Sequence, residues 1–244
     1  MDAQAFAVQA VREAQFDIAL AGLPCFSAAT ELYLSPLVPS HFVLAKHYIE
    51  SFPHQALMVD NSQKNTEGYL LSPTCCYPVF CHLKESNVQV PLLITHKNTC
   101  FRREEYYKPG ERQQAFRMRE YILLASDLDF VKNWIEIVKS NVLQMLVHLG
   151  ISAEIKAATD PFFNPGDFRL KFQANENLKS EFIFNGIAVG SVNLHLRSFS
   201  KSCGIKGRDG VPLYSACFGL GYDRVAAILD NPSCCLFVLD SDSS

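Results

Sequence analysis

The chain has 244 residues, 48% of them hydrophobic, and a formal net charge of −3. That is enough apolar material for one sizeable core. Acidic and basic residues are mixed, which excludes a basic stripe that would neutralise a run of nucleic-acid phosphates. The sequence contains no stretch of about 18 uncharged apolar residues, so no membrane span is expected. The N-terminal segment has no signal-peptide core. We therefore expect one cytoplasmic domain.

The nine cysteines form no regular framework. Two adjacent pairs occur, Cys75-Cys76 and Cys234-Cys235, and neighbouring cysteines are poor disulfide partners because the bridge is strained. Together with the missing signal segment, this indicates a reducing compartment in which the thiols are free or bind metal.

Two helices are predicted in the first 150 residues, with a mixed segment between them. Residues 3–22 are amphipathic and should end near Gly22. Segment 33–60 is expected to form a loop, a short helix and an extended edge. Residues 128–149 carry apolar side chains at steps of three and four, which predicts one long helix. We expect Ser126 with Asp129 to cap its start and Gly150 to end it.

Strand patterns occur both before and after the long helix. They fall at 69–72, at 91–96, at 168–173, twice within 181–197 with a turn near Asn185-Gly186 or Gly190, and at the start of 215–229, which continues as a tight turn and a helix. Strands in consecutive runs favour an antiparallel sheet with helices packed on one side.

The fold class predicted is therefore α+β. A single domain is expected over 1–244, with an N-terminal helix in 1–30, the core in 31–232, and a final strand and tail in 233–244.

The first segment with chemical potential runs from Cys100 to Glu120. A strand ends in Phe101-Arg102-Arg103-Glu104, a Pro-Gly loop follows, and a second strand begins near Phe116. Because side chains alternate, Arg102 and Glu104 share a face and could read a phosphate and an adenine amino group. From charge alone, an exposed hairpin with cross-strand ion pairs is the simpler interpretation.

The second segment is Phe218-Gly-Leu-Gly-Tyr-Asp-Arg224. Gly219 and Gly221 allow a close backbone approach. Arg224 lies in the first turn of a helix, against the dipole, which a bound phosphate would offset. The alternative is a tight turn with a solvated arginine, since the pattern matches neither GxGxxG nor a P-loop.

Two more sets of residues have open interpretations. Ser191, Asn193 and His195 alternate onto one strand face, which suits a small-ligand site or the solvent face of an edge strand. Cys75 or Cys76, Glu120 and Cys217 are soft metal ligands, but no CxxC or HExxH spacing predicts a site locally. No nucleophile motif is present, so any chemistry would work by positioning and charge stabilisation.

In this order, the segments resemble the catalytic domain of class II aminoacyl-tRNA synthetases. Phe101-Arg102-x-Glu104 with its loop and Phe116 is similar to motif 2. Gly219-x-Gly221-x-x-Arg224 is similar to motif 3, and residues 35–53 are similar to the motif 1 region.

The resemblance is closer to one branch, the amino acid:[carrier protein] ligases, homologues of the atypical zinc-dependent seryl-tRNA synthetases. It covers about residues 30 to 230. The further motifs that carry it are Tyr48-x-x-Ser51-Phe52-Pro53, Cys76-Tyr77-Pro78, Cys100-Phe101-Arg102-x-Glu104, Phe116-x-x-Arg119-Glu120, Asp160-Pro161-Phe162-Phe163, Ser191-x-Asn193-x-His195 and Ala216-Cys217-x-Gly219-x-Gly221.

The resemblance implies a zinc ion held by Cys76, Glu120 and Cys217, with an open position for the substrate amino group. Cys76 is preferred to Cys75 because it precedes Tyr77-Pro78, as the family ligand does. Asp160, Ser191 and Asn193 are implied to line the amino-acid pocket.

The resemblance also implies an ATP site. Arg102 would contact the α-phosphate and stabilise charge during adenylate formation, and Glu104 would read the adenine amino group. Phe116 and Arg224 would stack on the two sides of the adenine, with Arg224 also gripping the γ-phosphate. Arg112 would hold the terminal phosphates, and Mg²⁺ is expected with ATP.

The implied activity is ATP-dependent activation of a small amino acid, glycine or alanine, and transfer to the phosphopantetheine thiol of a carrier protein. Motif 1 implies a homodimer, and the lack of a recognisable tRNA-binding domain counts against tRNA. Glu105 departs from the family's usual proline, which leaves the acceptor open. The alternatives are an enzyme of the same class acting on tRNA or a small amine, and a non-catalytic amino-acid-binding paralogue.

Overall fold

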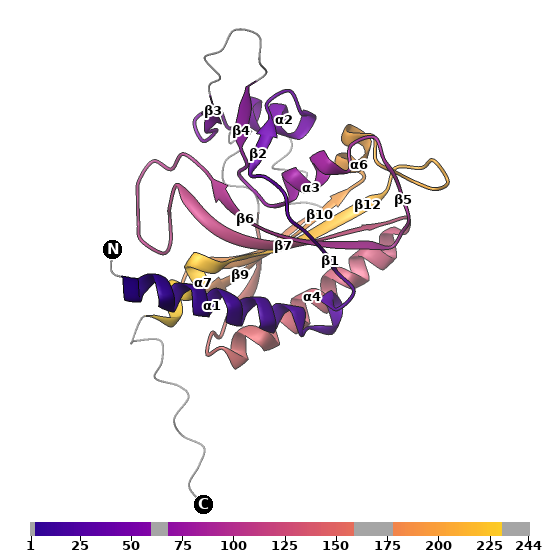
Figure 1. Ribbon diagram of the computed structural model, residues 1–244. Helices are drawn as coiled ribbons and strands as arrows, with labels where there is room; N and C mark the ends of the chain where they lie inside the picture. Colours follow the sequence, from indigo (N-terminus) through magenta and orange to yellow (C-terminus); the bar gives the residue numbers. More distant parts are fainter. Residues whose placement is uncertain (1–2, 60–67, 159–177, 231–244) are drawn as a thin grey trace, which may run out of the picture.

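The computed structural model describes residues 3–59, 68–158 and 178–230 (Figure 1). Asp160, the strand expected at 168–173 and the tail at 233–244 lie outside these ranges. No helix within the ranges is long and apolar enough to cross a membrane. The helices are α1 (Ala3–Ala21), η1 (Pro24–Phe26), α2 (Val43–Ser51), α3 (Cys76–His82), α4 (Leu128–His148), α6 (Ser198–Cys203) and α7 (Tyr222–Leu229).

A seven-stranded sheet forms the centre of the molecule, in the order β1-β6-β7-β12-β10-β9-β8. Neighbouring strands are antiparallel except β1, which is parallel to β6. The sheet is antiparallel as expected, except at the β1 edge, where the chain reaches β6 by a crossover. The strands are β1 (Thr30–Leu32), β6 (Leu92–Phe101), β7 (Ala115–Ala125), β8 (Glu154–Ala157), β9 (Lys179–Phe184), β10 (Ile187–Leu196) and β12 (Tyr214–Gly221).

Two small sheets flank the large one. Strand β4 lies between β2 and β3, and β11 pairs with β5. Their bounds are β2 (Leu37–Pro39), β3 (Met58–Val59), β4 (Tyr69–Leu71), β5 (Asn87–Val88) and β11 (Lys206–Gly207). The segment 35–53, expected as the motif 1 region, supplies β2 and α2 of this part.

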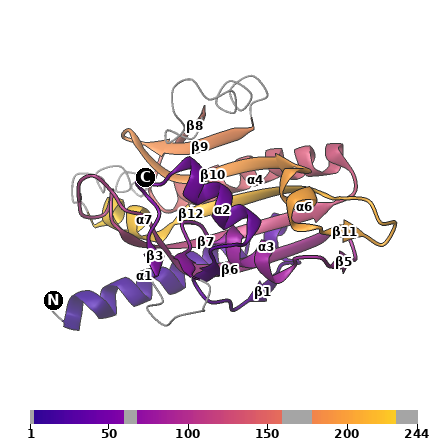
Figure 2. The ribbon, with the colours of Figure 1, turned by 90° about the horizontal axis from the view of Figure 1, so that it is seen from above.

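Helices cover both faces of the large sheet, which corrects the expectation of one covered face. Helices α1, α4 and α7 pack on one face, and α2, α3 and α6 lie over the other (Figure 1). Figure 2 looks onto the second of these faces. The reason lies in the interior strands, whose side chains are apolar in both directions. Tyr121 points into the core with α4, whereas its neighbour Ile122 points into the core with α2 and α3. Strands buried on both faces need cover on both faces.

Helix α4 confirms the predicted helix almost residue for residue. Val131, Val138 and Val142 are fully buried on the predicted face. The cap is Asp127 rather than Ser126, because Asp127 directly precedes the first helical residue and its carboxylate accepts from the backbone N–H of Phe130 at 2.7 Å. Gly150 takes a φ of 81° just past the helix end, as a left-handed stop requires.

The parallel edge strand is held by a buried histidine. The His96 Nδ1 lies 2.9 Å from the carbonyl of Leu32, and the Asn98 amide Nδ2 lies 3.1 Å from His96 Nε2. Because an amide nitrogen can only donate, Nε2 accepts and Nδ1 carries the proton, so the ring is neutral. Burial lowers the pKa of His96 below 6.5, and the charge of Arg119 adds to this.

A pH-dependent stability follows from His96. Above pH 6.5 both folded and unfolded chains hold a neutral ring. Below it, the unfolded ring gains a proton that the folded ring resists, so the free energy of unfolding should fall as the pH is lowered from 7 to 5. His96→Gln should weaken this dependence, measured by urea unfolding at each pH. The same change at exposed His148 is the control, and equal slopes for the His96 variant and the wild type would contradict the assignment.

Candidate active site

A pocket opens where the loop between β6 and β7 meets the start of α7. Its walls include Arg102 and Glu104 from the loop, Phe116 from β7, Gly219 from β12 and Arg224 from α7. The structure thus brings together residues that the sequence spreads over more than 120 positions. On β7, Phe116, Met118 and Glu120 point to the same face because side chains alternate along a strand.

Two of the predicted nucleotide contacts are bonded to each other. Arg112 Nη1 lies 3.0 Å from Glu104 Oε2, and the Glu104 side chain is only 7% exposed. The Arg112 guanidinium also lies 4.8 Å from the ring centre of Tyr106. This loop is therefore folded over its own pocket by a partly buried ion pair.

Arg102 and Arg224 both line the pocket. Arg102 donates to the carbonyl of Pro73 at 3.0 Å and lies 5.0 Å above the Phe116 ring. Arg224 donates to the carbonyls of Glu111 at 2.9 Å and Ala188 at 2.8 Å. Burial and the nearby charge of Arg102 both lower the pKa of Arg224. The charges of Glu181 and Glu104 act on Arg224 in the opposite direction. Guanidiniums that line a pocket suit an anionic ligand such as a phosphate.

Gly110 allows the loop to dock on α7. Its φ is +72°, and a Cβ built there would lie 2.3 Å from the Cβ of Ala227. A glycine is therefore required both for the backbone conformation and for the contact.

Next to the pocket, three predicted metal ligands converge on the same face. In the β7–β12 ladder Glu120 lies opposite Gly219, and Cys217 is two residues further along β12. Cys76 begins α3 above them. The Cys76 and Cys217 thiols are hydrogen-bond partners, and the Glu120 carboxyl bonds to Cys76.

The protonation of this cluster is linked. The hydrogen bond from Cys76, and the neighbouring His195, lower the pKa of Cys217 well below its usual value. The same bond and burial raise the pKa of Cys76. Burial and the Cys217 thiolate raise the pKa of Glu120, whose Oε2 is buried with no hydrogen-bond partner.

The Cys217 thiolate, the Cys76 thiol and the unpartnered Glu120 oxygen are ligand types that a soft divalent cation binds, and they are neighbours in the fold. In the arrangement seen, the Cys76 and Cys217 thiols are free and are joined by a hydrogen bond. Within the described ranges, no group of three or more His, Cys, Asp or Glu side chains is already placed to hold a metal ion. Cys75, the competing ligand, has its thiol on the Met118 carbonyl at 3.3 Å and 3.7 Å from Cys100 Sγ.

The polar face of β10 lies beside Cys217. Asn193 Nδ2 lies 3.7 Å from Cys217 Sγ and 3.3 Å from Ser191 Oγ, and His195 Nε2 lies 3.4 Å from the same sulfur. The interpretation as a solvent face of an edge strand is wrong, because β10 lies between β12 and β9. Asp160 lies outside the described residues.

Sequence reasoning missed several charged residues of the pocket, two of them on β9. Lys179 and Glu181 on β9 line the pocket and form a 3.0 Å ion pair. Their spacing of two is the same strand period that identified Ser191 and Asn193, so a strand prediction extended back to 179 could have found them.

Comparison with known proteins gives this geometry a family context. No family model matches the chain. The amino acid–[acyl-carrier-protein] ligases 1 and 2 of Bradyrhizobium diazoefficiens are each 31% identical to it, over 173 and 172 residues. The chain is a homologue of the amino acid–[acyl-carrier-protein] ligases. The resemblance seen in the sequence motifs is thereby confirmed.

These matches take in 66% of the chain and about half of each relative, 51% and 50%. The fold is shared more widely. The crystal structure of M. kandleri SerRS with A. aeolicus tRNASec matches with a TM-score of 0.74 at 18% identity, over 90% of this chain and 51% of that one. Prolyl-tRNA synthetase from Cryptosporidium parvum matches at 0.67 and 16%, over 89% and 44%. The predicted class II synthetase-like α+β fold is confirmed.

The docking of the loop on α7 can be tested at Gly110. Gly110→Ala should lift the loop, because overpacking costs about 1–3 kcal/mol. We expect tryptic cleavage after Arg112 to accelerate about fivefold or more, measured by mass spectrometry over time. Gly186→Ala is the matched control, since Gly186 also has a positive φ of 81° but no atom within 4 Å of the added Cβ. An unchanged cleavage rate in the Gly110 variant would show that the loop does not depend on this contact.

Proposed function

We propose that the chain uses ATP to activate a small amino acid, glycine or alanine, as its adenylate and transfers it to the phosphopantetheine thiol of a carrier protein. The supporting observation is one sheet face that carries both halves of such a site. Phe116 and Glu120 are four residues apart on β7, about 13 Å. Arg102 and Arg224 lie at the Phe116 end of this face, and the Cys76 and Cys217 thiols lie at the Glu120 end.

In the first step, a carboxylate oxygen of the amino acid attacks the α-phosphorus of ATP. The bond from that phosphorus to the bridging oxygen breaks, and pyrophosphate leaves. Arg102 would offset the charge that develops on the α-phosphate, and Arg224 would hold the departing phosphates. Both guanidiniums already line the pocket, so they need little rearrangement.

On this proposal, nucleotide binding requires the ion pair between Arg112 and Glu104 in the loop to break, so that both side chains can bind ATP. Glu104 would release Arg112 and accept the adenine amino group, while Arg112 would move to the terminal phosphates with Mg²⁺. Phe116 would exchange its contact with Arg102 for the adenine ring. Each charge keeps a partner throughout, which limits the cost of the exchange.

The amino-acid end would depend on zinc. Cys76, Glu120 and Cys217 would hold the ion, which supplies an open coordination position for the unprotonated substrate amine. Ser191 and Asn193, with Asp160, would line the space around the side chain. Support comes from the unpartnered Glu120 oxygen and the stabilised Cys217 thiolate, both of which a nearby dication would satisfy.

In the second step, the carrier thiol would attack the activated carbonyl, its proton would be lost, and AMP would leave as a thioester forms. The names of the two relatives favour a carrier protein over tRNA or a small amine. We also propose a homodimer, as the motif 1 resemblance implies.

The first step is tested by amino-acid-dependent ATP–pyrophosphate exchange across glycine, alanine and serine. Arg102→Ala should lower kcat/KM by about 10²–10³. Arg103→Ala is the matched control, since Arg103 is adjacent but exposed and outside the pocket. No exchange by the wild-type chain with any amino acid would rule out both enzyme interpretations. Labelling of carrier protein against tRNA would then identify the acceptor.

The zinc proposal has a readout that does not need turnover. Cys217→Ala should remove the bound metal and abolish exchange, measured by elemental analysis of the purified protein. Cys25→Ala is the control, because Cys25 lies on the other side of the sheet, against the core with α4. One zinc per chain in the Cys217 variant would refute this ligand set.

A further inference from the structure

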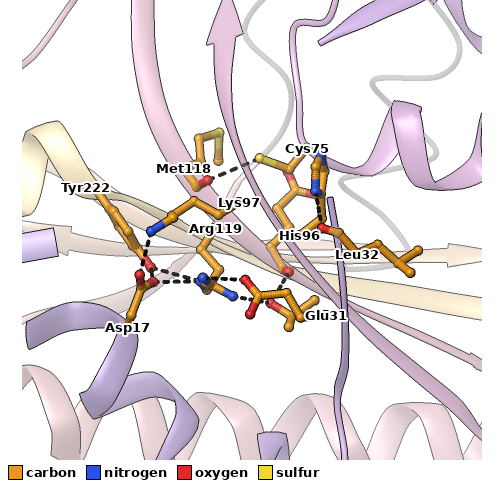
Figure 3. Close-up of polar contacts among 11 residues, drawn as sticks. Asp17, Glu31, Leu32, Cys75, His96, Lys97, Met118, Arg119 and Tyr222 are labelled. Atoms are coloured by element: carbon orange, nitrogen blue, oxygen red, sulfur yellow. Dashed lines mark hydrogen bonds and ion pairs between the residues drawn. The ribbon is translucent and has the colours of Figure 1, made fainter. Parts of the chain in front are cut away.

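The face of the sheet opposite the pocket carries a charge network centred on Asp17 of α1 (Figure 3). The Asp17 carboxylate accepts from Lys97 Nζ at 2.6 Å, from Arg119 Nε at 2.7 Å and from the Tyr222 hydroxyl. Arg119 is 6% exposed and also pairs with Glu31 at 2.8 Å. Four elements distant in sequence thus meet at one buried guanidinium.

A second set repeats this pattern one helical turn earlier. Glu13 of α1 pairs with Arg117 of β7. Arg117 Nη2 in turn lies 3.0 Å from Asp223 Oδ1, and the Arg117 backbone N–H donates to the same carboxylate at 2.5 Å. Glu13 and Asp17 share a helix face because they are four residues apart. Arg117 and Arg119 share a strand face because they are two apart, and Arg117 with Asp223 also borders the pocket.

Both sets end on the first two residues of α7. Tyr222 and Asp223 are bonded to Arg119 and Arg117, and Arg224 follows them directly. On the opposite face of β7, Phe116 and Glu120 point into the proposed site. The two sets therefore determine how the start of α7 is placed against β7.

Stability alone does not account for this arrangement. Apolar side chains would hold α1 to the sheet at least as well, because buried ions lose much of their mutual attraction to desolvation. Burial alone would raise the pKa of Asp17, yet the hydrogen bonds from Lys97 and Tyr222 and the charge of Arg119 hold it below its usual value. Asp17 is charged at neutral pH, so its bonds keep a defined direction and length.

We propose that Glu13 and Asp17 are positioning residues for ATP: through Arg117 and Arg119 they fix the distance between Arg224 and the nucleotide-facing side chains of β7. This inference rests on the proposed ATP-dependent function. It predicts that loss of either carboxylate weakens the nucleotide site selectively, since an arginine displaced by a fraction of an ångström no longer meets its phosphate.

The test is steady-state exchange with Asp17→Asn and Glu13→Gln, which remove charge and keep size. KM for ATP should rise about tenfold, while KM for the amino acid stays within about twofold. Asp17→Glu restores the charge and should recover part of the loss. Binding of ATP, measured by calorimetry without amino acid, should weaken in parallel.

Asp230→Asn is the matched control. It breaks the 2.6 Å pair of Asp230 with Arg12, which also joins α1 to α7 but at the far end of α7. It should lower the melting temperature without changing KM for ATP. An equal rise in KM for ATP in this control, or an unchanged KM in both carboxylate variants, would overturn the inference.

If one carboxylate variant fails to fold, the other still decides, because each set reaches α7 by its own arginine. A wild-type chain that neither exchanges nor binds ATP overturns the proposed function and this inference with it. A wild-type chain that does both, beside variants with normal KM for ATP, overturns this inference alone.

Discussion

The antiparallel register between β7 and β12 is the constraint on which the rest of the site depends. It places Glu120 opposite Gly219, so that Cys217 lies diagonally beside the carboxyl. A side chain at 219 would meet the Glu120 Cγ at 3.1 Å. A slip by one residue would turn the thiol and the carboxyl to opposite faces, because the side-chain period of a strand is two. The cores on both faces oppose such a slip, since it would turn Tyr121 or Phe218 out of the core with α4 toward the other face.

Local periodicity was sufficient to predict most of the architecture. The helix at 128–149 and the two strands around the 102–114 loop follow from side-chain spacing, which acts within a few residues. Of the two turn positions predicted, Asn185-Gly186 and Gly190, the structure has the first, where both residues adopt a positive φ. The parallel β1 edge was not predicted, because three residues carry no distinctive period. Its partner is fixed by His96, 64 residues from Leu32 along the chain.

The sequence was sufficient to name several residues of the candidate site, but not to predict which of them pair with each other. Family motifs named Arg102, Glu104 and Arg112, and the structure brings all three to one loop. That Arg112 pairs with Glu104 depends on how the loop folds back, which no spacing records. The contact between Tyr222 and Asp17, 205 residues apart, is of the same kind. Such pairs arise from tertiary packing, and single-sequence patterns report only neighbours along one element.

Strand β7 joins these observations because its two faces have different partners. Phe116 and Met118 line the pocket, whereas Arg119 pairs with Asp17 of α1. Arg117 pairs with Glu13 of α1 and also borders the pocket. Since a strand cannot rotate one face without the other, any shift of α1 is transmitted to the side chains of the pocket. The chemistry proposed here therefore depends in part on charges, such as Asp17 and Arg119, that lie outside the pocket. The position of α1 relative to β7 is well defined because these charges are hydrogen-bonded in a network with few alternative arrangements.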